Sequence, residues 1–182
     1  MKDHIMLDIE TLSTSTWNAV ITQIGACRFS SEGVAVNGAS DQFLVGLDTA
    51  PQMRMGRVMD EDTMRWWDEQ EGSPFLKDYF HPARALQAFS EWVGHVDPTR
   101  IWANGIVFDG GNLWSLYDQL ELETPWQYNS WVDMRSLRRW WGMGKPAMAP
   151  THNALQDAID QAKYIWPECR AHLNREDGLY NA

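Results

Sequence analysis

Two carboxylates alternate with apolar residues near the start of the chain, where residues 4–10 read HIMLDIE. Such alternation predicts a β-strand, and because strand side chains point to opposite faces in turn, Asp8 and Glu10 are expected on one face. Two carboxylates on one face repel each other unless a cation neutralises them, and hard oxygen ligands suit Mg²⁺ or Mn²⁺. The segment therefore predicts a divalent-metal site. The alternative, common in half-exposed strands, is a solvated edge.

Two further segments carry residues suited to the same chemistry. Residues 101–113 read as a short apolar strand, a turn and the start of a helix, with Asp109 where the helix should begin. Taken alone, Asp109 is typical of an N-cap, which accepts a hydrogen bond from a free backbone amide. Residues 151–162 favour a helix, with His152 at or before the first turn and Asp157 inside it. Taken alone, these two side chains are typical of a solvated surface.

The three segments, in this order, resemble the motifs of the DEDDh 3′–5′ exonuclease family. The resemblance covers about residues 4–166 and is strongest toward RNase T-like enzymes of phages and bacteria. Its motifs are Asp8-Ile9-Glu10-Thr11, then Asn104 with Phe108-Asp109, then His152 with Asp157, and residues 19–26 and 133–137 are similar as well. No single motif is highly specific, but all three at these intervals are.

The resemblance implies catalytic roles. Four acids would hold two Mg²⁺ or Mn²⁺ ions: Asp8, Glu10, Asp109 and Asp157. His152 would take a proton from the attacking water. Chemistry supports this division independently of the family, because two cations about 4 Å apart can activate water on one side and stabilise a departing oxygen on the other. An imidazole with a pKa near 6.5 is suited to accept a proton.

The resemblance also implies substrate contacts, at Thr11, Leu12, Asn104, Phe108 and Arg135. In similar enzymes the residue at the Leu12 position lies beside the terminal base, and an apolar residue just past the acids is suited to that place. The alternative for Leu12 is the protein core. The chain also departs from commoner family forms here, because Leu12 is followed by the polar run 13–16.

Charge and aromatic content bear on the substrate. The chain of 182 residues has a formal net charge of −10, which is unfavourable for gripping a long duplex. A short footprint at a 3′ end is therefore favoured. Basic side chains gather at Arg135, Arg138, Arg139 and Lys145. Phosphate binding and a solvated helix face are both open for this cluster. Most of the eleven tryptophans are expected in the core, with Trp66 or Trp67 as the candidate to face substrate.

The pattern of apolar and turn residues predicts an α/β fold. We expect strands near 4–10, 18–30, 34–47, 100–104 and 127–132, and helices near 61–70, 83–96, 110–122, 133–141 and 152–165. Residues around Pro51 and Arg57 are expected to be irregular, and Pro167 to end the last helix. This order suits a single domain over residues 1–182 with a mixed central sheet of about five strands flanked by helices on both faces. The RNase H-like exonuclease fold has that order.

Several classes of protein are disfavoured. No apolar run is long enough to span a bilayer, and the N-terminus lacks the features of a signal peptide, so a cytoplasmic location is expected. Cys27 and Cys169 are far apart and suggest neither a disulfide framework nor a zinc site. The resemblance adds homodimerisation as an option, which nothing in the sequence establishes.

The sequence thus predicts a 3′–5′ exonuclease that acts on the 3′ ends of single-stranded DNA or RNA and releases nucleoside monophosphates. The direction and the exonucleolytic mode come from the resemblance. One alternative is a structure-specific endonuclease on the same fold, and another is a catalytically silent module that binds nucleic acid or a protein. DNA and RNA both stay open, because that choice depends on contacts to the ribose 2′-hydroxyl.

Overall fold

The computed structural model describes residues 4–35, 38–70, 72–94, 100–147 and 149–179. The strands are β1 (His4–Thr11), β2 (Ile21–Ser30), β3 (Gly33–Val34), β4 (Gln42–Leu47), β5 (Tyr79–Phe80), β6 (Arg100–Ala103) and β7 (Trp131–Asp133). The helices are α1 (Thr49–Arg54), α2 (Glu61–Asp68), α3 (Pro82–Val93), α4 (Ile106–Gln119), α5 (Met134–Trp140) and α6 (Ala154–Leu179). Within these residues, no helix is both long and apolar enough to cross a bilayer.

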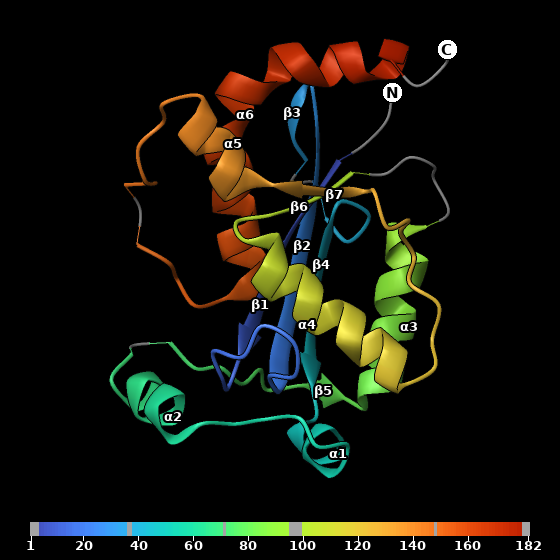
Figure 1. Cartoon of the computed structure of the whole chain (residues 1–182), viewed down its shortest axis with the longest axis vertical. Coiled ribbons are helices and arrows are strands. Elements are labelled where there is room, and N and C mark those ends of the chain that lie inside the picture. The colour runs from blue at the N-terminus through green and yellow to red at the C-terminus, as the bar shows by residue number, and fades with distance from the viewer. Residues whose placement is uncertain (1–3, 36–37, 71, 95–99, 148, 180–182) are drawn as a thin grey trace.

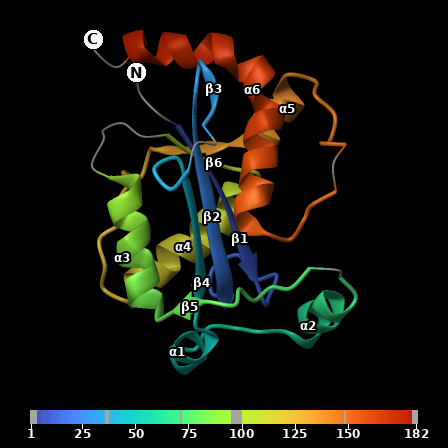
Figure 2. The same cartoon turned by 180° about the vertical axis from the view of Figure 1, so that it is seen from behind.

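The strands form one mixed sheet in the order β5-β4-β2-β1-β6-β7, and β3 pairs with the end of β2. The central strand β1 runs antiparallel to β2 and parallel to β6. Helices α3 and α4 cover one face of the sheet, whereas α5 and α6 cover the other (Figures 1 and 2). The expected α/β class with helices on both faces is confirmed. Five strands have three or more residues, and β3 and β5, of two residues each, complete the sheet.

Alternation along β1 divides the core into two layers. Ile5, Leu7 and Ile9 are buried with side chains of α3 and α4. Met6, on the opposite face, is buried with side chains of α5 and α6. Because side chains two apart share a face, the two acids of β1 lie on the α6 side of the sheet.

The start of α6 is held close to the middle of β2. A Cβ on Gly25 would lie 2.1 Å from the backbone carbon of Ala154, so a larger residue here would push α6 away from the sheet. Gln23 Oε1 also accepts a hydrogen bond from the Ala154 N–H, at 3.3 Å. The Gln23 amide group donates to the carbonyls of Ser73 and Pro74 at 3.1 and 3.2 Å. Small size at Gly25 and a bridging amide at Gln23 therefore fix the first turn of α6.

The segment between β2 and α2 differs from the sequence prediction. The strand expected over 34–47 is replaced by β3 and β4, with residues 36–37 outside the described part of the chain. The stretch expected to be irregular contains α1, because Asp48 caps this helix by accepting from the Ala50 N–H at 3.0 Å. The prediction of an irregular stretch around Pro51 was wrong there, because this proline lies in the first turn of α1, where proline is tolerated.

The last helix was predicted too short. It continues past Pro167 to Leu179, although proline lacks the N–H that a helix interior requires. The final turns run across one end of the sheet, at a clear angle to the first part of α6 (Figure 1). A proline in a long helix thus bends this helix and does not end it.

Candidate functional site

Four carboxylates from three elements meet at the end of β1. Asp8 and Glu10 come from β1, Asp109 from the first turn of α4, and Asp157 from the first turn of α6. Glu10, Asp109 and Asp157 are buried, and Asp8 is partly buried. All four acids predicted from the sequence therefore lie together, although they are up to 149 positions apart along the chain.

Burial raises the pKa values of Asp8, Glu10 and Asp109, and the charges of neighbouring acids add to the effect at Asp8 and Glu10. The pKa of Asp8 is raised well above its usual range, first by burial and then by the charges of the three other carboxylates. Burial raises the pKa of Glu10 to about 8, with Asp157 and Asp109 adding to the effect. Burial also raises the pKa of Asp109 to about 7, although backbone amides and Arg135 oppose this. Divalent cations would remove the repulsion and keep the acids ionised.

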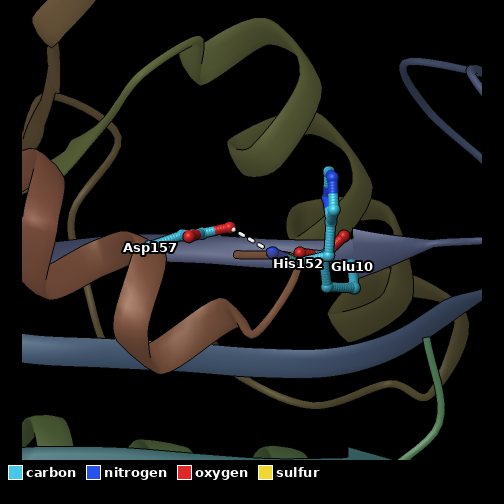
Figure 3. A group of neighbouring side chains, drawn as sticks. All are labelled: Glu10, His152 and Asp157. Carbon is cyan, nitrogen blue, oxygen red and sulfur yellow. Dashed lines mark hydrogen bonds between the residues drawn. The ribbon is translucent and has the colours of Figure 1, made fainter. Parts of the chain in front are cut away.

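The carboxylate of Asp157 is oriented by Thr151 and His152, in the segment just ahead of α6. The Thr151 N–H and hydroxyl donate to Asp157 Oδ1 at 2.7 and 2.8 Å. The His152 N–H donates to Asp157 Oδ2 at 3.0 Å, as Figure 3 shows. Glu10, His152 and Asp157 each offer one ligand atom, and these three atoms lie within 4.8 Å of one another. The backbone that positions the acid thus also brings the histidine to the site.

His152 combines an uncommon backbone conformation with aromatic neighbours around its side chain. Its φ of 59° lies in the left-handed region, which residues other than glycine rarely adopt. The rings of Trp66 and Trp67 lie nearly perpendicular to the imidazole, with centroids 4.8 and 5.4 Å away. Trp67 Nε1 in turn donates to the carbonyl of Thr11 at 3.0 Å. Helix α2 therefore braces the imidazole against the end of β1.

Sequence reasoning missed two polar residues of the site. Gln161 Nε2 donates to Asp8 Oδ1 at 2.8 Å, and its Oε1 is buried without a hydrogen-bond partner. Gln161 follows Asp157 by four positions, so helical periodicity would have placed both on one face. Thr151 was missed as well. The signal there was a threonine just ahead of a helix, a position where its hydroxyl commonly bonds to polar groups of the first turn.

Asp109 is available to the site because Gly105 takes the N-cap position of α4. The N-cap reading of Asp109 is therefore wrong in this structure. The first amide of α4, that of Ile106, donates instead to Asp133 Oδ2 at 3.0 Å. Asp133 Oδ1 accepts from the Ser136 N–H at 2.6 Å and so caps α5. Asp133 thus ties the start of α4 to the start of α5.

Two hollows of similar size flank the carboxylates. The first, which we call the acidic pocket, has a volume of about 800 Å³ and four carboxylates in its wall, those of Glu10, Asp60, Glu61 and Asp62. The second, the basic cleft, has a volume of about 850 Å³ and is lined by Arg135, Arg138, Arg139, Lys145 and Lys163, together with Asp157 and Asp160. Because Glu10 lines one hollow and Asp157 the other, the four-carboxylate site lies between them.

The five residues expected to contact substrate divide between these hollows and the core. Thr11 and Phe108 line the acidic pocket, and Asn104 and Arg135 line the basic cleft. Leu12 is only 1% exposed and belongs to a buried cluster with Val20 and Trp67. The core alternative for Leu12 is therefore the one that this structure supports.

The sequence of this chain matches a known enzyme family over residues 3–167. That family is described as the 3′-5′ exoribonuclease Rv2179c-like domain. The chain belongs to this family. The expectation of a 3′–5′ exonuclease family, and hence of an enzyme family, is confirmed. No curated protein sequence matches the chain significantly.

Solved structures of E. coli exonuclease I have a similar fold. The zinc-bound form of its complex with single-stranded DNA superposes with a TM-score of 0.65 at 13% identity, covering 99% of this chain and 42% of that chain. The complex with a dT13 oligonucleotide gives a TM-score of 0.67 at 14% identity, covering 96% of this chain and 43% of that chain. The chain thus spans about two fifths of the length of these relatives. The similarity confirms the expected RNase H-like fold.

Proposed function

We propose that this protein removes nucleotides one at a time from the 3′ end of single-stranded DNA or RNA and releases nucleoside monophosphates. The observation that carries the proposal is the meeting of four carboxylates next to a braced histidine, with the charges of the neighbouring acids adding to the raised pKa values of Asp8 and Glu10. Family membership supports the direction and the exonucleolytic mode. The exonuclease I structures with bound oligonucleotide support a single-stranded substrate.

We infer that the four acids hold two Mg²⁺ or Mn²⁺ ions. An all-oxygen donor set of carboxylates suits these hard cations. The unpaired Oε1 of Gln161, next to Asp8, supplies one more buried oxygen that needs a partner. When bound, such ions neutralise the acids and favour attack on a phosphodiester by stabilising the charge that develops there. The four acids would place the positive charge of these ions at the end of β1.

His152 is proposed as the general base. It accepts a proton from the attacking water while the water oxygen bonds to phosphorus. The bond from phosphorus to the 3′-oxygen of the preceding nucleotide then breaks, and that oxygen takes up a proton. The hydrogen bond between the His152 N–H and Asp157 and the ring contacts with Trp66 and Trp67 support this role, because they hold the imidazole beside the acids.

The acidic pocket supports cleavage at an end over cleavage within a strand. Among the residues that the structure describes, its wall has four carboxylates and no basic side chain, together with Phe108 and the half-exposed ring of Trp66. A terminal nucleoside with a free 3′-hydroxyl carries no phosphate beyond the scissile one and can enter such a pocket. An internal segment would bring further phosphates against the carboxylates, which is electrostatically unfavourable. The endonuclease alternative is therefore less favoured.

Labelled oligonucleotides test the proposal directly. DNA and RNA strands labelled at the 3′ or 5′ end are incubated with Mg²⁺, with Mn²⁺ or with EDTA. We expect mononucleotides from the 3′ label, a ladder of shortened strands from the 5′ label, and no product in EDTA. Asp157→Asn should be inactive, whereas Asp118→Asn, an exposed acid of α4, serves as a matched control that keeps full activity. Discrete internal fragments would favour the endonuclease, and intact strands under every condition would refute nuclease activity.

A further inference from the structure

The basic cleft concentrates positive charge in an acidic protein. The chain has 15 lysines and arginines against 25 acids, yet five of these basic residues line this one hollow. They come from α5, from the segment after it and from α6, and share the cleft with two carboxylates, those of Asp157 and Asp160. Local charge of this kind attracts polyanions even where the net charge is negative. The sequence left phosphate binding and a solvated helix face open for this cluster, and its convergence on a single cleft favours phosphate binding.

The cleft is continuous with the proposed catalytic site. Asp157 and Gln161, which belong to that site, also line the cleft. The guanidinium of Arg135 lies against Gly105, because a Cβ on that glycine would be 3.4 Å from Arg135 Nη2. Arg135 is also close enough to lower the pKa of Asp109. A strand in the cleft would therefore reach the four carboxylates without a break.

Some polar groups along the cleft lack partners. Arg138 is 7% exposed, and its Nη1 donates to the carbonyl of Gly144 at 2.7 Å. Its Nε is buried without a hydrogen-bond partner, and the same is true of Asn104 Oδ1. Leaving a buried charged donor unpaired costs more than an ordinary hydrogen bond contributes. Arg138 therefore forms part of the cleft wall, whereas Arg135, Arg139 and Lys145 are exposed to a ligand in the cleft.

We propose that the basic cleft binds the phosphates of the strand on the 5′ side of the scissile bond. This inference rests on the proposed function and adds the path of the substrate to it. Arginine pairs with phosphate through two parallel hydrogen bonds, and lysine acts as a point charge. The terminal nucleoside then occupies the acidic pocket, the scissile phosphate lies at the carboxylates, and the preceding phosphates meet Arg135, Arg139 and Lys145. The opposite charges of the two hollows favour this orientation of the strand over the reverse one.

Charge reversal at two exposed positions of the cleft tests this path. Arg139→Glu combined with Lys145→Glu is compared with a matched control, Lys77→Glu combined with Arg84→Glu, which changes the net charge equally at exposed sites outside the cleft. Activity is measured as kcat/KM on a dinucleotide and on a long single strand. The cleft variant should lose at least about tenfold more activity on the long strand than on the dinucleotide. The control should lose no more on one substrate than on the other.

Binding gives a readout that does not depend on hydrolysis. Anisotropy of a 5′-fluorescein single strand, in Ca²⁺ and in EDTA, reports the affinity at several salt concentrations. Because each phosphate contact on a single strand contributes about −0.7 to the slope of log K against log salt, the cleft variant should lose about 1.4 of that slope. Equal slopes for the wild type and the cleft variant would overturn the proposed path. If the wild type binds but does not hydrolyse, the proposed function fails while the cleft assignment stands.

Discussion

The acidic pocket and the basic cleft are hollows of similar volume, about 800 and 850 Å³, but of opposite charge. The pocket is walled by carboxylates and by aromatic rings, whereas arginines and lysines dominate the cleft. The four-carboxylate site lies between them. The distribution of charge, and not the net value of −10, therefore determines how a polyanion can approach this protein.

Helix ends explain how the two hollows acquire their charge. Glu61 and Asp62 occupy the first turn of α2, where the partial positive charge of the helix N-terminus favours acids. Arg138 and Arg139 occupy the last turn of α5, where the C-terminus favours bases. Residues that stabilise each helix locally thus also polarise the surface on either side of the site.

The largest effect on activity should come from substitutions in the four-carboxylate site, which lies between the two hollows. Asp8→Asn removes one of the proposed metal ligands and should lower kcat/KM by more than about 10⁴-fold, because metal-ion catalysis supplies several kcal/mol. Calorimetric titration with Mn²⁺ should show weaker binding at the same time. A variant that binds Mn²⁺ like the wild type, or that stays active, would remove Asp8 from the metal site.

Two substitutions of His152 distinguish a catalytic role of its imidazole from a role of its backbone conformation. His152→Ala and His152→Asn should both lower kcat by between about 10² and 10⁴-fold, the usual contribution of a general base. Asparagine tolerates the left-handed conformation at φ 59° better than alanine, so thermal unfolding should show the asparagine variant to be the more stable one. If His152→Asn recovered activity, the histidine would act only through its backbone.

Neutralising carboxylates of the acidic pocket should reduce the difference in charge between the two hollows, and with it the selection for a 3′-hydroxyl end. We expect the wild type to discriminate against a 3′-phosphorylated strand relative to a 3′-hydroxyl strand, because an added phosphate would face the pocket carboxylates. Glu61→Gln combined with Asp62→Asn should reduce this discrimination by about tenfold or less. The basic-cleft variant, Arg139→Glu combined with Lys145→Glu, provides the comparison. It should leave the ratio of the rates on the 3′-hydroxyl and 3′-phosphorylated strands unaltered. Discrimination that survives pocket neutralisation would show that the pocket does not receive the terminal nucleoside.

Removing an aromatic ring from the wall of the acidic pocket should have a smaller effect on activity. Trp66 is 41% exposed and both lines the acidic pocket and contacts the His152 ring. Stacking of a base on an aromatic ring contributes about 1–3 kcal/mol, so Trp66→Ala should raise KM by roughly tenfold. Trp66→Phe, which keeps a ring, should recover most of that loss. An unchanged KM together with a lower kcat would assign Trp66 to positioning of His152 alone.

The smallest effect concerns stability without metal. Burial raises the pKa of Glu10 in the folded state to about 8, from an ordinary value of 4.5, so the folded protein holds the extra proton and loses stability as pH rises through this window. Glu10→Gln should therefore melt with the wild type near about pH 4, but roughly 3–8 °C above it near about pH 9 in EDTA. Scanning fluorimetry measures both. Mn²⁺ should stabilise the wild type more than the variant. A lower melting temperature for the variant than for the wild type at high pH would show that the ionised Glu10 carboxylate does not destabilise the fold.

Much of the fold could be predicted from local sequence patterns, and so could the pairing of Asp8 and Glu10 in the site. Alternation around Asp8 and Glu10 correctly indicated a strand with both acids on one face, because that period is a property of the strand itself. The helical pattern found the first part of α6, residues 154–165, but the run through Pro167 could not be read from local propensity, since packing overrides it. The contacts of Thr151 and Gln161 with site carboxylates were missed although both residues carry a local signal, a place just ahead of α6 for Thr151 and a spacing of four from Asp157 for Gln161.

The sequence by itself determined the chemistry of the candidate site: hard oxygen ligands, an imidazole, and basic and aromatic side chains in separate segments. These are properties of residue types and of short-range spacing. Only the tertiary structure decided that Asp109 and Asp157 meet the acids of β1, that Leu12 is buried, and that basic residues from α5 to α6 share one cleft. Such long-range contacts depend on strand order and on how closely α6 approaches β2, and neither is encoded in any single segment.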